Sequence, residues 1–247
     1  MSSIHRGFTA QFKTCNHNRF LTKLRDMPSE GNSRGENRGE NLNKSQWAPG
    51  LGPNFAAVHD IEPHFAWLGF YSACEDPRSP FFEREYSEFY FEHTVYNYLI
   101  HPQWDHFGSN TLYLKVLFAD YQDGYAILEF IGEWSDALYN DIMTLKREVL
   151  EILMEEGIKR FVIIGENILN FHSSDDSYYE EWFQDVDLAG WIALVNFRDH
   201  VMDEMRSAGI DYYLNFGGEL DDIEWRKMGP RELYAKVESL MSKRLEA

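Results

Sequence analysis

The sequence predicts an α/β fold with a mostly parallel or mixed central sheet and helices packed on it. Two observations support this prediction. Residues 161–164 form a short apolar run that ends at Gly165, and such continuous hydrophobicity is typical of a strand buried on both faces. In addition, the order helix, glycine, isoleucine, strand, glycine occurs twice, at residues 138–165 and 199–218. Two such units in succession favour parallel strands joined by helices.

Residues 1–50 have the composition of a disordered, basic, polar tail. They are rich in Asn, Ser, Gly and Arg and carry a net charge of +4, whereas the rest of the chain carries −22. Such a segment cannot bury enough apolar surface to offset the entropy lost on ordering. We therefore expect a tail at residues 1–50 and a single α/β domain at residues 51–247. The composition is also compatible with a targeting segment or a partner-binding arm.

Removal of residues 1–46 is expected to leave the stability of the domain unchanged, because this segment offers no core-forming face. The variant that starts at Trp47 should remain in solution and should melt at the same temperature as the full chain when unfolding is followed by circular dichroism. Aggregation, or a clearly lower melting temperature, would show that the segment is packed and that the domain boundary is misplaced.

Residues 51–110 form an aromatic-rich extension of the domain, with ten Phe, Tyr and Trp residues from position 81 to position 107. Pro80 and Pro102 interrupt the segment, and residues 86–100 fit one or two strands. Because aromatic side chains bury large areas, we expect the extension to pack against the main sheet and not to stand alone.

Residues 111–247 are expected to form the core of the domain, beginning with a β-hairpin. In the strand at residues 111–120, alternate residues are apolar and would share one face: Leu112, Leu114, Val116 and Phe118. Asp123-Gly124 is a hairpin turn sequence, and residues 125–131 supply the partner strand. These two strands are therefore predicted to form an antiparallel pair.

A helix is predicted after this hairpin. Its apolar residues recur at intervals of three and four: Leu138, Ile142, Leu145, Val149 and Ile152. This spacing places them on one face of an amphipathic helix. Gly157 is a helix stop, and Ile158 is the apolar residue expected just beyond it. The buried strand at residues 161–164 follows directly.

The remaining elements continue the alternation of helices and strands. The sequence predicts a short helix at residues 178–183, a strand at 191–197, a helix at 199–208 that stops at Gly209, and a strand at 212–216. Pro230 marks the start of a last helix. The apolar stripe that would cover the sheet consists of Leu233, Val237, Leu240 and Met241.

The order strand, strand, helix, strand, helix, strand, helix, strand, helix over about residues 111–245 resembles the STAS (sulfate transporter and anti-sigma-factor antagonist) family. In that family, the strand after the first helix leads into a loop that carries a serine phosphorylated by a partner kinase. The resemblance places Ser173 and Ser174 at about this position. The family usually has an Asp before its serine and a Gly after the pair, where this sequence has His172 and Asp175. The resemblance thus implies the place of a phosphorylation site.

The composition of residues 51–247 argues against two classes of partner. Their strong negative charge repels nucleic acid phosphates and anionic membrane surfaces, so we expect neither as a partner. No apolar run approaches the ~20 residues of a membrane span, and we expect no membrane insertion. The two cysteines, Cys15 and Cys74, do not form a disulfide framework, which fits a reducing compartment. We therefore expect a cytoplasmic protein.

The loop after the buried strand is the first candidate site, because functional residues of α/β sheets collect beyond the carboxyl ends of the strands. It contains His172, Ser173, Ser174, Asp175 and Asp176. The aspartates are well suited to capping the helix that follows. Alternatively, the loop is phosphorylated or docks a partner, with Tyr178 and Trp182 as exposed contacts. A third interpretation is a metal site made by His172, Asp175, Asp176 and Glu180.

A second candidate lies at residues 101–106, where His101, Asp105 and His106 could approach one metal ion. Pro102 and Trp104 favour a packed turn instead. Ser or Asp in the segment 132–136, between a strand and a helix, is expected to act as a helix cap. The chain contains no zinc pattern, nucleophile elbow or dinucleotide fingerprint, so we expect no cofactor.

These observations give two functional hypotheses. The favoured one is a non-enzymatic regulatory or protein-interaction module that binds a protein partner through the loop at residues 172–176. A homo-oligomer is compatible with it. The alternative is a metal-assisted hydrolase that uses His172, Asp175, Asp176 and Glu180. The first is favoured because the sequence shows a clear scaffold but no complete catalytic set, and metal analysis of the purified protein would separate the two.

Overall fold

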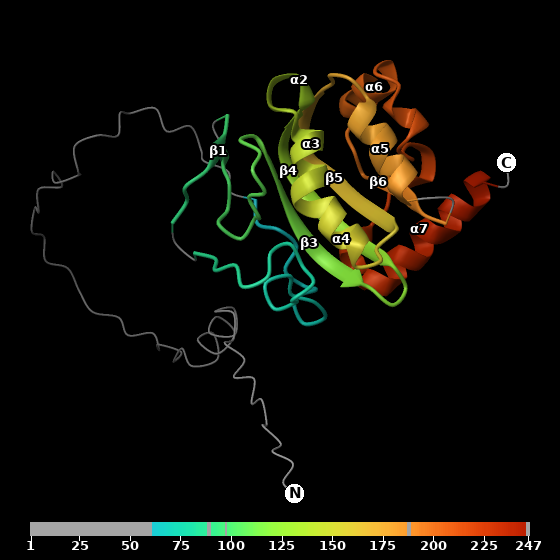
Figure 1. Ribbon diagram of the computed structural model, residues 1–247. Coiled ribbons are helices and arrows are strands. Elements are labelled where there is room, and N and C mark those ends of the chain that lie inside the picture. Colours follow the sequence, from blue (N-terminus) through green and yellow to red (C-terminus); the bar gives the residue numbers. More distant parts are fainter. Residues whose placement is uncertain (1–60, 88–89, 97, 187–188, 246–247) are drawn as a thin grey trace, which may run out of the picture. The chain divides into compact units, whose positions relative to one another are not determined.

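The computed structural model describes residues 61–87, 90–96, 98–186 and 189–245, shown in Figure 1. The predicted tail at residues 1–50 lies outside these ranges. A four-stranded sheet has the order β3-β4-β5-β6. Its strands are β3 (Leu112–Asp120), β4 (Tyr125–Ser135), β5 (Arg160–His172) and β6 (Trp191–Val195). Because β3 is antiparallel to β4 while β4, β5 and β6 are parallel, the predicted α/β fold with a mixed sheet is confirmed.

Helices pack on both faces of this sheet (Figure 1). The segment α3–η1–α4, together with α5 and α6, covers one face, and α7 covers the other. The helices are α2 (Asp136–Tyr139), α3 (Asp141–Leu145), the π-helical turn η1 (Lys146–Leu150), α4 (Glu151–Glu155), α5 (Ser177–Val186), α6 (Asp199–Ser207) and α7 (Pro230–Leu245). Three short 3₁₀ helices are η2 (Ile210–Tyr212), η3 (Gly218–Leu220) and η4 (Trp225–Lys227).

The two faces of the sheet bury separate hydrophobic clusters. Alternate residues of β5 serve the two clusters, because Phe161 and Ile163 pack with α3–α6 whereas Val162 and Ile164 pack with α7. All four are fully buried, as the continuous hydrophobicity of this stretch predicts. In the part of the chain that the structure describes, no helix has both the length and the apolar character needed to cross a membrane.

One residue of the first predicted strand lies on the opposite face from its expected neighbours. Leu112, Leu114 and Val116 belong to the cluster under α3–α6, but Phe118 belongs to the cluster under α7. The pairing register of β3 with β4 shifts between Val116 and Phe118. Such a bulge inserts one extra residue, so the side chains beyond it change faces.

The helical segment after β4 also departs from the predicted apolar stripe. Val149 is buried as expected, but Leu138 is 75% exposed and Ile152 is 36% exposed. Leu138 lies in α2, which the left-handed backbone of Asn140 separates from α3. The wider turn of η1 shifts the helix phase by about one residue. Leu153 consequently faces the core in place of Ile152.

The end of one predicted strand and the existence of another were predicted wrongly. β5 does not end at Gly165 but continues to His172. A Cβ atom on Gly165 would lie 2.1 Å from the ring of Phe197, so this glycine permits close packing and does not make a turn. The strand predicted at residues 212–216 is replaced by η2 and an isolated parallel bridge between Ala193 and Asn215.

The described part of the aromatic-rich extension, which begins at residue 61, packs on the sheet, as expected. Trp67 belongs to the cluster under α7, whereas Phe81 and Phe107 belong to the cluster on the other face. The backbone amide of Asp105 donates to the carbonyl of Leu114 on β3 at 2.7 Å, and the reverse bond measures 3.2 Å. Within the region predicted to hold one or two strands, two short strands pair antiparallel: β1 (Thr94–Val95) and β2 (Tyr98–Leu99).

Candidate functional site

The loop between β5 and α5 is exposed beyond the carboxyl end of β5. His172 is the last residue of β5 and pairs in register with Ser135, the last residue of the parallel strand β4. The side chains of Ser173 and Ser174 are exposed, and in the described part of the chain their hydroxyl groups have no hydrogen-bond partner. The loop therefore offers two accessible hydroxyl groups at the edge where α/β sheets usually carry their sites.

A carboxylate on the neighbouring strand holds His172. The Nε2 atom of His172 lies 2.8 Å from Oε1 of Glu133, which is near the end of β4. Glu133 also accepts a hydrogen bond from the hydroxyl of Tyr96, and this bond raises the pKa of Tyr96. Asn170 donates to the same tyrosine oxygen at 3.3 Å. Through Glu133, His172 thus links the loop to β4 and, by way of Tyr96, to the segment between β1 and β2.

The two aspartates of the loop shape the start of α5. The backbone amide of Ser177 donates to Oδ1 of Asp175 at 3.1 Å, and its hydroxyl donates to the same oxygen. These bonds lower the pKa of Asp175. The backbone carbonyl of Asp176 accepts from the amides of Tyr179 and Glu180 at 3.0 Å, as in the first turn of a helix. This arrangement agrees with the capping interpretation.

The aromatic residues of α5 are distributed differently from the expectation. Trp182 was expected to be an exposed contact, but it is fully buried and its ring meets that of Phe161 edge to face at 5.4 Å. Tyr178 is only partly exposed and lies under the guanidinium of Arg147. Phe183 is 48% exposed instead, because the helical period places it one residue beyond the buried face.

The residues of the proposed metal site each contact a different group. His172 pairs with Glu133, and Asp176 accepts a hydrogen bond from the hydroxyl of Tyr213 at 2.9 Å. Glu180 accepts a hydrogen bond from Gln184 at 3.0 Å, while Asp175 is bound to Ser177 as described above. Among the residues with described positions, no group of three or more His, Cys, Asp and Glu side chains is placed to hold a metal ion.

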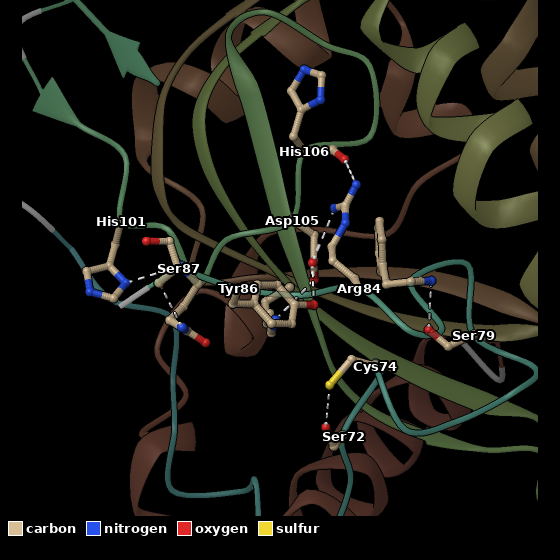
Figure 2. A network of polar contacts seen from close by, with 12 residues as sticks. Ser72, Cys74, Ser79, Arg84, Tyr86, Ser87, His101, Asp105 and His106 are labelled. Carbon is tan, nitrogen blue, oxygen red and sulfur yellow. Dashed lines mark hydrogen bonds and ion pairs between the residues drawn. The ribbon is translucent and has the colours of Figure 1, made fainter. Parts of the chain in front are cut away.

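The second candidate, His101 with Asp105 and His106, does not converge either (Figure 2). His101 lies 3.5 Å from a carboxylate oxygen of Glu62, and the ring of His106 stacks on that of His93 at 5.1 Å. Figure 2 shows the ring of His106 pointing away from Asp105, and His101 on the far side of Tyr86. Asp105 instead occupies the centre of a buried polar network.

Two buried aspartates lie just beyond the carboxyl end of β4: Asp136, which had been expected only as a possible helix cap, and Asp141 in α3, for which the sequence had suggested no role. Oδ2 of Asp136 accepts from the hydroxyl of Tyr179 at 2.6 Å, and Oδ1 accepts from the amide of Ile142 in the first turn of α3 at 2.8 Å. Asp141 accepts from the backbone amide of Ser135 at 2.7 Å. Burial raises the pKa of Asp136 to about 6 and raises that of Asp141. These hydrogen bonds hold α3 and α5 against the carboxyl end of β4.

One buried acidic residue was missed entirely. Glu129 lies in the middle of β4, between two apolar residues, and its side chain is fully buried like theirs. Its carboxylate contacts Arg226, which also pairs with Glu166 on β5. The only signal in the sequence was a single charged residue inside an apolar strand, which is unusual for a strand covered on both sides.

Comparisons with known proteins add no further information on this site. No protein-family model, no curated protein and no solved structure matched the chain.

Proposed function

We propose that this protein is a non-enzymatic protein-interaction module that docks a partner through the loop at residues 172–176 and the adjoining surface of α5 and η2. The observation that carries this proposal is the continuity of the exposed loop with exposed aromatic side chains. The hydroxyl of Tyr213, next to η2, donates a hydrogen bond to the carboxylate of Asp176. The ring of Tyr213 lies 6.1 Å from that of Phe183 and 6.4 Å from that of Tyr212.

The composition of this surface suits a protein partner. Tyr212 is 85% exposed and Phe183 is 48% exposed, and large aromatic side chains are common contacts in protein interfaces. Asp175, Asp176 and Glu180 lie beside them with exposed side chains. A surface that combines aromatic rings with carboxylates favours a partner segment with arginine or lysine side chains, which can pair with both groups.

We further propose that phosphorylation of Ser173 or Ser174 regulates this docking. The position resembles that of the phosphorylated serine in the STAS family, and both hydroxyl groups are accessible. A phosphoryl group adds about −1.5 to −2 charges. Because Asp175, Asp176 and Glu180 follow the two serines closely in the sequence, the new charge would be repelled and would disturb a docked partner more than it would order the loop.

The double variant Ser173→Asp with Ser174→Asp is expected to weaken partner binding about ten-fold, equivalent to about 1.4 kcal/mol, because it places two further negative charges in the docking surface. Partners recovered with the wild-type chain would be identified by mass spectrometry, and their affinities would then be measured by titration calorimetry. The Ala pair should bind as the wild type does. Phe183→Ser should also weaken binding, since it removes an exposed aromatic contact.

The matched control is Ser242→Asp on α7, whose exposed serine lies on the opposite side of the sheet. It should bind like the wild type. Equal binding by the Asp pair, the Ala pair and the wild type would exclude a switch in this loop. A stoichiometric metal ion that is lost in His172→Ala would instead favour the hydrolase hypothesis.

A further inference from the structure

The buried carboxyl group of Glu129 lies under a short segment that precedes α7. Glu129 follows Ile127 on β4 by two residues and shares its face of the sheet, toward α7. Its Oε2 atom accepts from the backbone amide of His64 at 2.8 Å, and its Oε1 atom lies 3.3 Å from a guanidinium nitrogen of Arg226. Both covering groups come from outside the sheet, one from the extension and one from η4.

Residues 223–228, which we call the strap, are attached to the rest of the molecule at both ends. At one end, the side-chain amide of Asn196 donates to the carbonyl of Ile223 and accepts from its N–H group, each at 2.9 Å. At the other end, the indole of Trp67 donates to the carbonyl of Met228 at 3.0 Å. Arg226 lies between these two attachments and reaches inward to Glu129.

The middle of the strap depends on charged and aromatic contacts. The same guanidinium nitrogen of Arg226 contacts both Glu129 and Glu166, and the indole of Trp225 donates to Glu166 at 3.4 Å. The ring of His64 meets that of Trp225 at 4.8 Å. The Nε2 atom of His64 is buried and has no hydrogen-bond partner among the described residues. Glu129 is therefore covered by one cation that it shares with a second carboxylate.

We propose that Glu129 is a proton-controlled latch for the strap: the strap is closed when Glu129 is protonated and opens when Glu129 is ionised. The hydrogen bond from the amide of His64 favours the ionised form, but burial opposes ionisation more strongly. An ionised carboxylate at this fully buried position loses its hydration, and that loss is costly unless the charge is well paired. Opening the strap would return water to the carboxylate.

The charged groups around Glu129 do not fully compensate its ionisation. Arg226 attracts the carboxylate, but its side chain is 45% exposed and shared with Glu166, which repels Glu129. His64 supplies only its backbone amide, and burial together with Arg226 lowers its pKa, so its ring is neutral at pH 7. Burial raises the pKa of Glu129 from 4.5 to about 7.

The direction of the pH effect follows from this raised pKa. The closed strap binds the proton more tightly than an open strap, in which a hydrated Glu129 would titrate near its ordinary value of 4.5. The closed state is therefore favoured fully below that value and loses its advantage as the pH rises through about 7. Between pH 5 and pH 8 the open population should rise by about two orders of magnitude.

Amide hydrogen exchange of the full chain, followed by mass spectrometry between pH 5 and pH 8.5, tests this proposal. After correction for the intrinsic pH dependence of exchange, the protection of residues 223–228 should fall steeply from pH 5 to about pH 7 and level off above pH 7, by about 100-fold in all. Residues 161–164, in the central strand, should keep their protection over the whole range. Equal losses in both segments would indicate global destabilisation and would contradict a local latch.

Two variants assign the effect to its residue. Glu129→Gln keeps the shape of the side chain but cannot ionise, so the protection of the strap should become independent of pH. The matched control Glu224→Gln neutralises an exposed carboxylate of the strap itself and should retain the pH dependence of the wild type. A pH dependence that persists in Glu129→Gln would overturn the proposal. If that variant does not fold, carbon-13 NMR of the Glu129 carboxyl group in the wild type can measure its titration directly. A titration midpoint below pH 5.5 would also contradict the proposal.

Discussion

Ile163→Asp is expected to abolish stable folding, or to leave a protein that unfolds far below the melting temperature of the wild type. Ile163 lies on β5, between β4 and β6, and is fully buried in the cluster under α3–α6. The substitution removes an apolar side chain and places an unpaired carboxylate in a site without water. Such changes cost about 4–5 kcal/mol or more, a large part of the roughly 5–15 kcal/mol that stabilises a typical domain.

A matched substitution separates this effect from the general cost of an aspartate. Ile152→Asp makes the same chemical change on α4, where the isoleucine is 36% exposed. It should cost only about 1 kcal/mol, because the carboxylate stays in contact with water. Urea unfolding followed by circular dichroism would measure both variants. Equal losses would mean that Ile152 is packed, as the sequence pattern suggested, and that the phase shift at η1 is absent in solution.

The fold could be predicted from the sequence wherever hydrophobic pattern and turn residues agreed. The hairpin at Asp123-Gly124 and the helix stop at Gly157 are present as predicted, because each glycine has the left-handed backbone that favours this residue. Gly165 was misinterpreted because a glycine needed for packing against Phe197 cannot be distinguished in sequence from one needed for a turn. The bulge at Val116 likewise leaves no local signal in an entirely apolar strand.

The candidate site was predictable in position but not in its contacts. The loop after β5 could be found because polar residues follow an apolar strand, and the helix that follows begins at Ser177 as capping by Asp175 implies. The contact of His172 with Glu133 depends on the parallel pairing of β4 with β5 over their last residues, which no local sequence pattern indicates. The strap over Glu129 joins segments separated by 65 and 97 residues, so only tertiary structure reveals it.

Asp105→Ala is expected to destabilise the protein by about 3–5 kcal/mol, because it leaves a buried cation without its partner. The side chain of Asp105 is fully buried. Its Oδ1 atom accepts from the hydroxyl of Tyr86 at 2.6 Å and from Arg84 at 3.3 Å, and its Oδ2 atom lies 3.3 Å from Nζ of Lys115. Lys115 is itself nearly buried, with its ammonium group 3.7 Å from the ring centre of Tyr86.

The same network joins the aromatic-rich extension to β3, so its loss should loosen that extension first. Urea unfolding would measure the free energy of Asp105→Ala, and proteolysis would report cleavage within residues 78–106. The control Asp203→Ala removes an exposed partner of Arg206 and should change the stability by less than about 0.5 kcal/mol. Adding Lys115→Met to Asp105→Ala should recover part of the loss, since the unpaired charge is then absent. If the double variant is as unstable as the sum of the single ones, Asp105 acts through packing and hydrogen bonds, and the buried ion pair contributes nothing.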